Sequence, residues 1–279
     1  LRLGSSIPYP FIAYNTMDKI YSLRKMLFFK RQQHLIVLSI LLLILFFSIA
    51  THLRKAYGAE NIDQYATMRQ FMVEKHLKAR DIDDKTVLNS MGTVPREKFV
   101  LEKDKDIAYI DSAIPIDYGQ AISQPSLVAL MTQLLEPKKD HIALEIGTGT
   151  GYQAAVLAEI VDRVYTIEII PQLGKSAAKR LHALGYNNIT VKIADGYYGW
   201  KEYAPFDCIV VTAAASHLPP PLIKQLKRGG KMVIPVGLPF LPQHLVLVKK
   251  SLDGDVHTRN VIGVMFVPFV REINNNSKQ

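Results

Sequence analysis

Three glycines in the segment LEIGTGTGYQ, namely Gly147, Gly149 and Gly151, lie between an apolar run and a helix-favouring stretch. Glycine lets a strand turn sharply into a helix and lets the backbone approach a ligand closely. The dinucleotide pattern GxGxxG requires a glycine where Tyr152 stands, so an NAD oxidoreductase is disfavoured. The spacing GxGxG after the acidic Glu145 favours a turn that seats the amino-acid part of S-adenosylmethionine. A purely structural turn is the alternative.

Carboxylates also end the next two apolar runs. Glu168 stands about twenty residues past the first glycine, where an acid accepts both ribose hydroxyls of an adenosine. That role fits NAD equally well, so Glu168 indicates an adenosine without choosing the cofactor. Asp195, followed by Gly196, ends the next run, where a carboxylate can accept the adenine amino group. An ordinary turn residue is the alternative for such an acid.

The elements that must position these residues form an alternating pattern from residue 141 onward, which predicts a parallel sheet in an α/β fold. Strands are expected at 141–146, 164–169, 188–194, 206–212 and 231–236, followed by antiparallel edge strands at 244–250 and 263–269. Helices are expected at 60–82, 84–91, 126–135, 152–161, 171–184 and 220–227. The first helix would bury one face made of Tyr65, Met68, Phe71, Met72 and Leu77. Ligands bind at the carboxyl ends of such strands, so the glycines and acids converge there.

Most of the formal charge of +9 belongs to the N-terminus, because residues 1–59 carry eight Lys or Arg and one acid. Residues 60–279 carry only +2, which argues against a nucleic-acid partner. Within the N-terminus, residues 35–50 are apolar throughout, with a length between a signal-peptide core and a spanning helix. They predict either a retained membrane anchor or an export leader cleaved near residues 56–59. A helix buried in the main domain is less favoured, because every face is apolar.

Few other residues suggest chemistry. The lone Cys208 has no partner for a disulfide or a zinc site and is interpreted as a small core residue. The histidines show no metal-ligand spacing, so no metal is expected. Trp200 could cover the adenine or pack beneath a loop.

The chain resembles the protein-L-isoaspartate O-methyltransferases over roughly residues 62–272. Six segments carry the resemblance: VPREKFV (94–100), GQAISQPSLVALMTQLL (119–135), LEIGTGTGYQ (144–153), APFDCIVVTAAA (204–215), LKRGGKMVIPVG (226–237) and FVPFV (266–270). The resemblance implies a Rossmann-like class I S-adenosylmethionine-dependent methyltransferase fold. It adds an N-terminal helical extension and an altered order of the last strands. The hydrophobic N-terminal segment lies outside it.

The activity that the resemblance implies is methylation of L-isoaspartyl, and less well D-aspartyl, carboxyls in damaged proteins and peptides. The ester then cyclises to a succinimide, which reopens in part to normal aspartate. Ser123 corresponds to the family's active-site serine, and Gln120, Ala121 and Ile122 would shape the cofactor pocket beside it. A carboxylate is already ionised near neutral pH, so orientation is needed more than a base. Family members usually carry Thr where Ala121 stands, which puts the strength of activity in doubt.

Alternatives stay open at this point. Ser123 could merely cap the helix that follows Pro125. The same fold could methylate another carboxylate, a small molecule or RNA, or it could serve as a membrane-tethered binding protein without activity. A monomer is expected, with the oligomeric state left open. The family works in the cytoplasm, whereas residues 35–50 point to the membrane or to export.

Overall fold

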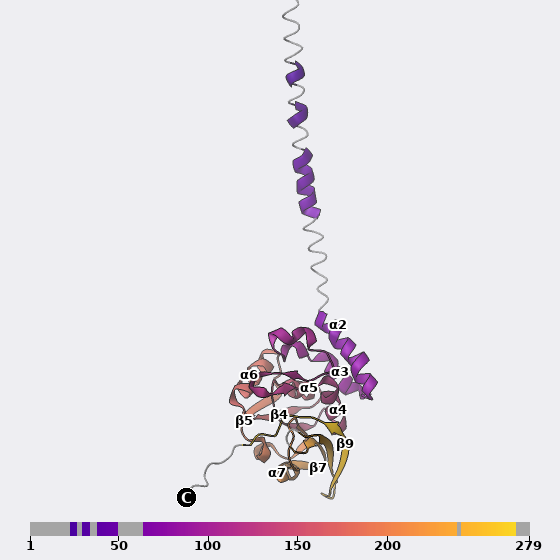
Figure 1. The fold of residues 1–279 in the computed structure, drawn as a ribbon, viewed down its shortest axis with the longest axis vertical. Helices are drawn as coiled ribbons and strands as arrows, with labels where there is room; N and C mark the ends of the chain where they lie inside the picture. The colour runs from indigo at the N-terminus through magenta and orange to yellow at the C-terminus, as the bar shows by residue number, and fades with distance from the viewer. Residues whose placement is uncertain (1–22, 27–29, 34–37, 50–63, 239–240, 272–279) are drawn as a thin grey trace, which may run out of the picture. The chain divides into compact units, whose positions relative to one another are not determined.

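The computed structural model describes five stretches of the chain (Figure 1): 23–26, 30–33, 38–49, 64–238 and 241–271. Contacts divide the chain into two units, Leu1–Ile62 and Asp63–Gln279, and each is described by itself.

The described residues of the first unit are helical and belong to the span Leu23–Ile49. This span of 27 residues has a mean hydropathy of 2.2 and is long and apolar enough to cross a membrane. A signal sequence near the N-terminus would have the same properties. Its described apolar side chains, among them Leu43 and Phe46, are exposed. Residues 35–37 and 50, and the predicted cleavage region 56–59, lie outside the described residues.

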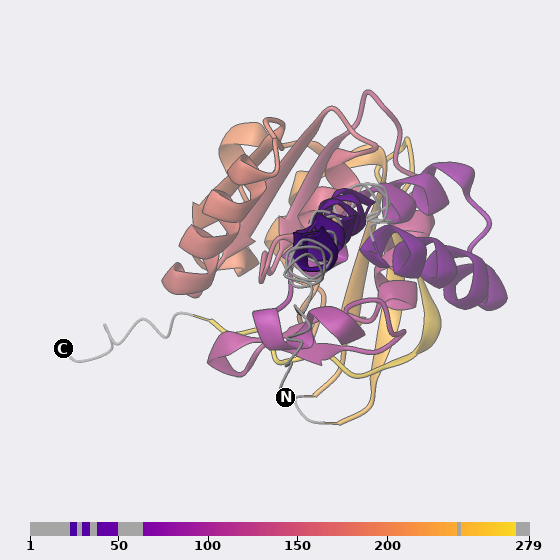
Figure 2. The same ribbon diagram turned by 90° about the horizontal axis from the view of Figure 1, so that it is seen from above.

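The second unit is built on a seven-stranded sheet in the order β5-β4-β3-β6-β7-β8-β9, with helices packed around it in Figure 2. The strands are β3 (Ile142–Ile146), β4 (Arg163–Glu168), β5 (Ile189–Ile193), β6 (Phe206–Val211), β7 (Leu226–Val236), β8 (Gln243–Lys250) and β9 (Val256–Val264). The first five are parallel and the last two antiparallel, so the α/β prediction with antiparallel edge strands is confirmed.

The position of the last strand was predicted wrongly, because β9 ends where the expected strand begins. Residues 265–271 instead run to the carboxyl ends of the parallel strands, where the Phe269 amide donates to the Ala214 carbonyl at 2.9 Å. Pro268 in this apolar segment lacks the N–H that a sheet ladder needs. The exposed β9 carries mostly polar and β-branched residues, which suit a solvated edge.

Alternating side chains of the central strands enter two hydrophobic layers. In β6, Cys208 and Val210 face one layer, and Ile209 and Val211 face the other. Burial raises the pKa of the Cys208 thiol to about 12, which agrees with its interpretation as a core residue. The helices are α2 (Gln64–Phe71), α3 (Lys85–Thr93), α4 (Pro125–Leu135), α5 (Tyr152–Ala158), α6 (Pro171–Ala183) and α7 (Pro220–Gln225).

The helix expected at 60–82 is interrupted in the structure. After α2, the chain forms a π-helical turn at Met72–Leu77 and a 3₁₀ turn at Lys78–Arg80. Phe71, expected on the buried face, is 56% exposed, while Val73 is buried in its place. A π turn adds a residue to the helical repeat, which explains why the buried face shifts at this point.

Candidate active site

The glycine turn after β3 has the backbone geometry that the sequence predicted. Gly147, Gly149 and Gly151 all have positive φ, at 96°, 53° and 92°. A Cβ atom at Gly147 would lie 2.4 Å from Thr212 Oγ1, so any side chain there would clash. The Thr212 hydroxyl also lies within hydrogen-bond distance of the carbonyls of Ile146 at 3.0 Å and Gly147 at 2.7 Å, so it ties the turn to the end of β6.

Glu168, at the end of β4, holds the same turn from the other side. Its Oε2 accepts a 2.8 Å hydrogen bond from the Gly149 amide, and its Oε1 accepts one from the Ile170 amide at 3.0 Å. It lines a cavity of about 60 Å³, which we call the adenosine-side cavity. The other predicted residues around it are Gln120, Ala121, Gly147, Gly149 and Gly196. The structure therefore brings these predicted cofactor residues together.

Glu145 is fully buried beneath the turn. Thr166 Oγ1 donates to its Oε2 at 2.5 Å, but Oε1 has no hydrogen-bond partner among the described residues. Burial, reinforced by the nearby Glu168 charge, raises the pKa of Glu145 to about 8, and the hydrogen bond from Thr166 opposes this shift. The carboxyl lines a second cavity of about 40 Å³, the turn-side cavity, together with Ile122 and Ser123. A buried oxygen without a partner is expected to receive a donor from a ligand.

The Asp195 side chain is not brought to either cavity. Its Oδ1 accepts a hydrogen bond from the Tyr197 amide at 2.9 Å, and its Oδ2 accepts one from Arg271 Nε at 2.9 Å. Its neighbour Gly196 does line the adenosine-side cavity. A contact between Asp195 and adenine therefore stays a prediction.

Trp200 packs beneath a loop and does not line the adenosine-side cavity. Its ring centroid lies 5.4 Å from that of Tyr165 and 5.2 Å from that of Tyr203. The Lys192 ammonium lies 4.8 Å from the same ring. Of the two interpretations that the sequence allowed, the structure supports packing.

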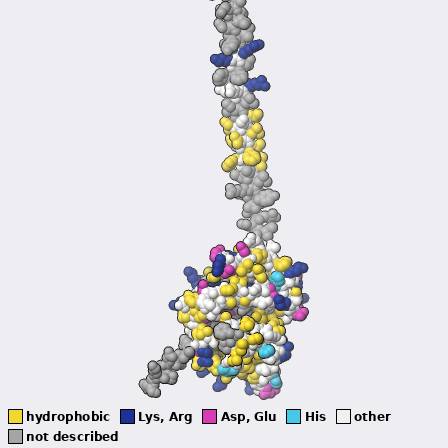
Figure 3. Space-filling view, viewed as in Figure 1, with side chains coloured by type: hydrophobic (Ala, Val, Ile, Leu, Met, Phe, Trp, Pro, Cys, Tyr) yellow, Lys and Arg dark blue, Asp and Glu magenta, His cyan; other side chains and the backbone are white. Residues whose placement is uncertain are grey.

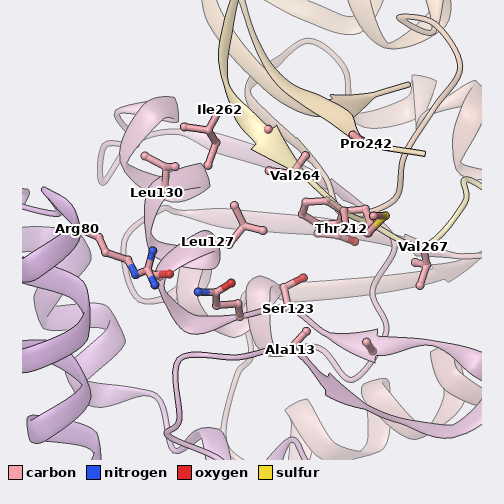
Figure 4. A pocket seen from close by; sticks show the side chains of 16 residues that line it. Arg80, Ala113, Ser123, Leu127, Leu130, Thr212, Pro242, Ile262, Val264 and Val267 are labelled. Atoms are coloured by element: carbon pink, nitrogen blue, oxygen red, sulfur yellow. The ribbon is translucent and has the colours of Figure 1, made fainter. Parts of the chain in front are cut away.

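A third and larger cavity, of about 720 Å³, opens beside Ser123 (Figure 4); we call it the peptide-side cavity. Ser123 follows β2 (Ala121–Ile122), which pairs with β1 (Ile114–Pro115). It lines both the peptide-side and the turn-side cavities, while Ala121 and Thr212 line all three. The cavities thus meet at these three residues.

The Ser123 hydroxyl has no hydrogen-bond partner within the described part of the chain and does not cap α4. The N-cap residue of α4 is Gln124, whose side chain makes no capping bond. Asp111 accepts the hydrogen bond from the Ser126 amide at 2.9 Å instead. The alternative that Ser123 is a helix cap is therefore wrong, and its hydroxyl is available to a ligand.

Arg96 is a site residue that the sequence analysis missed. Its side chain is fully buried, and its Nη2 donates to the Ser123 carbonyl at 2.8 Å. Its Nε donates to the Ala108 carbonyl at 2.7 Å, and the guanidinium lies 4.6 Å from the centroid of the Tyr152 ring. Burial lowers its pKa. The sequence offered no clear signal, because Arg96 stands beside Glu97 and Lys98 in VPREKFV and resembles a surface charge.

Comparisons with known proteins agree with this geometry. A family model described as Protein-L-isoaspartate(D-aspartate) O-methyltransferase (PCMT) matches residues 67–274. The chain is 55% identical over 207 residues to Protein-L-isoaspartate O-methyltransferase 1 of Nitrosospira multiformis, covering 74% of this chain and 88% of the relative. Identity to the relative of the same name from Cupriavidus necator is 58% over 187 residues, covering 67% and 72%.

Solved structures give the same result. One protein-L-isoaspartate O-methyltransferase superposes with a TM-score of 0.66 at 28% identity, covering 72% of this chain and 65% of the other. A Plasmodium falciparum protein described as PCMT, in complex with S-adenosyl-L-homocysteine, superposes with a TM-score of 0.63 at 27% identity, covering 72% and 98%. The chain belongs to the protein-L-isoaspartate(D-aspartate) O-methyltransferase family.

Proposed function

We propose that this S-adenosylmethionine-dependent protein-L-isoaspartate O-methyltransferase transfers the methyl group where the adenosine-side, turn-side and peptide-side cavities meet, beside Ser123, Ala121 and Thr212. The observation that carries this proposal is the Ser123 hydroxyl, which has no hydrogen-bond partner among the described residues and belongs to a residue that lines both the turn-side and the peptide-side cavity.

The residues around the two small cavities suit S-adenosylmethionine. Glu168 can accept the ribose hydroxyls, and the bare backbone at Gly147 and Gly149 lets the cofactor approach. The unpartnered Oε1 of Glu145 suits a donor group at the amino-acid end. When bound, the cofactor supplies a methyl group that the positive charge on sulfur activates.

Room for the cofactor requires a movement of the protein. Pockets that bury a drug-sized ligand measure about 300–1,000 Å³, far more than the small cavities of about 60 and 40 Å³. Val267, Pro268, Phe269 and Val270 line one side of the adenosine-side cavity. We infer that this C-terminal segment shifts outward when the cofactor enters.

Ser123 would act by orientation. The isoaspartyl carboxylate is ionised at neutral pH, so it needs no base to become a nucleophile. A hydrogen bond donated by the Ser123 hydroxyl would aim one carboxylate oxygen at the methyl carbon. Alignment of this kind can remove several kcal/mol from a barrier. Arg96 would fix the serine by holding its carbonyl.

The test is transfer of a labelled methyl group to paired peptides that contain isoaspartate or aspartate at one position. We expect the wild type to label the isoaspartyl peptide, and Ser123→Ala to do so much more slowly. Equal labelling of both peptides would contradict a repair function. An unaffected Ser123→Ala enzyme would contradict only the role of the hydroxyl.

We also propose that residues 1–59 are a membrane anchor or export leader, separate from a catalytic domain at 60–279. The span Leu23–Ile49 and the exposure of its described apolar side chains support this division. Cell fractionation with protease protection tests it, and the mass of the mature protein distinguishes a retained anchor from a cleaved leader. Recovery of the uncleaved chain in the soluble cytoplasmic fraction would contradict both.

A further inference from the structure

Arg80 is the only charged residue among those that line the peptide-side cavity in the described part of the chain. The walls are otherwise mainly apolar, with Leu127 and Leu130 from α4 and Ile262 and Val264 from β9. In Figure 4, Arg80 lies on one side of the cavity and Thr212 on the other, with Leu127 and Ser123 between them. The volume of about 720 Å³ falls within the range of pockets that bury a drug-sized ligand, so it can take more than the isoaspartyl residue.

The Arg80 guanidinium is held at its Nε. This atom lies 2.8 Å from Asp111 Oδ2, and the terminal nitrogens make no hydrogen bond within the described residues. The Asp111 side chain is only 8% exposed and is also occupied by Gln124 and by the Ser126 amide. The Arg80 side chain is 59% exposed, so its two terminal NH₂ groups can receive a carboxylate.

The backbone that carries Arg80 is anchored to the cavity wall. Gln133 of α4 donates to the Asp81 carbonyl at 3.1 Å and accepts from the amides of Asp83 and Asp84 at 3.0 and 2.9 Å. These three bonds fix the turn after Arg80 against the helix that supplies Leu127 and Leu130. The backbone next to Arg80 therefore keeps this residue at the cavity wall.

Resting on the proposed function, we infer that Arg80 is a specificity-determining residue for substrates with a second carboxylate a few residues from the isoaspartyl residue. The methylated carboxyl itself must lie next to the cofactor, and Arg80 lines neither small cavity. Arg80 therefore meets a different carboxylate, from an Asp or Glu side chain or from the end of the peptide. The intervening residues would lie against the apolar walls.

The experiment compares kcat/KM for C-terminally amidated isoaspartyl peptides in which Glu or Gln occupies each position from four before to four after the isoaspartate. At the position that reaches Arg80, we expect the wild type to prefer Glu about fivefold, as for a partly exposed ion pair. High salt should reduce this preference. A second arm compares free and amidated C-termini, which separates a terminal carboxylate from a side chain.

The Arg80→Gln enzyme should bring the Glu-to-Gln ratio at that position close to one, and Arg80→Glu should invert it. Arg163→Gln removes a similarly exposed arginine on β4 and should leave the ratio as in the wild type. Equal use of Glu and Gln at every position and of both termini by the wild type, or a preference that survives Arg80→Gln, would overturn the inference. Failure of the wild type to methylate any isoaspartyl peptide would instead overturn the proposed function.

Discussion

The two sides of the site differ in how they are built. The proposed cofactor side consists of small cavities with buried carboxylates and with a glycine turn that Glu168 holds through the Gly149 amide. The proposed peptide side is one large cavity, whose walls are mainly apolar and whose described lining holds one cation, Arg80. The cofactor is always the same molecule, so exact contacts are useful on its side. Damaged sites occur in many sequence contexts. Apolar walls make non-directional contacts, so they select only weakly among these sequences.

The largest effect is expected from Gly147→Ala, which should abolish cofactor binding without altering the peptide-side cavity directly. The new Cβ would clash with Thr212 in a backbone conformation that alanine disfavours, at a cost of about 2–4 kcal/mol. We expect loss of measurable cofactor binding in calorimetry. Gly185→Ala is the control, because Gly185 also has positive φ but open space around its Cβ position. It should lower the melting temperature slightly and leave cofactor affinity intact.

Ser123→Ala should affect the junction between the two sides. Loss of a charge-assisted hydrogen bond of about 1.5–3 kcal/mol predicts a tenfold to hundredfold fall in kcat/KM for an isoaspartyl peptide. Cofactor affinity should fall less than kcat/KM, because Ser123 lines the turn-side cavity but not the adenosine-side cavity that Glu168 borders. Ser112→Ala, at an exposed serine nearby, serves as the control. A loss of cofactor affinity as large as the fall in kcat/KM would show that the Ser123 hydroxyl serves mainly to bind the cofactor.

Glu145 should make the stability of the folded protein depend on pH. Its pKa is about 8 in the folded chain and about 4.3 in an unfolded one, so the folded state holds the extra proton between these values. Stability of the cofactor-free protein should therefore fall as the pH rises from about 5 to about 8, and level off above. Melting temperatures across this window test the sign.

Glu145→Gln should flatten that slope. Glu136→Gln should preserve the slope. The hydrogen bond from Lys231 lowers the pKa of Glu136, so the effect of Glu136 on stability falls at a lower pH than this window. A wild-type slope that survives Glu145→Gln would show that another group titrates.

The smallest effect is expected from Leu130→Ala on the peptide side. Removing part of one apolar wall should raise KM for the peptide about threefold, with little change in kcat, because the site loses only non-specific contact area. Steady-state kinetics with one peptide measures this change. Leu184→Ala, at a partly buried leucine away from the cavities, should reduce stability without moving KM. An effect on KM as large as that of Ser123→Ala would show that the wall contributes more than contact area.

Sequence patterns predicted the cofactor side better than the peptide side. Glycine spacing and strand-end acids are local signals, and the parallel sheet brings them together by rule, so Gly147, Glu168 and Gly196 line one cavity as expected from the topology. Their roles in cofactor binding, and the role of Ser123 that the family resemblance implies, stay predictions. Asp195 was expected in the pocket, but its pairing with Arg271 depends on a contact across 76 residues that no local pattern reports.

The peptide side depends on contacts between distant segments. Arg80 and Ile262 line the same cavity although they are far apart in the chain, and no periodicity predicts that. The interrupted first helix and the misplaced last strand have the same origin. In both, tertiary packing overrode the local apolar pattern, which cannot distinguish a buried strand from a buried loop.

Arg96 couples the two sides mechanically. The guanidinium that holds the Ser123 carbonyl also rests on the ring of Tyr152, the first residue of the helix after the glycines. A displacement of the segment that carries Ser123 should therefore also move Tyr152 and the glycine turn before it. Both segments should lose their order together on heating. A shortened chain that kept only the sheet and its own helices would retain a cleft for the cofactor but no means of aiming the acceptor.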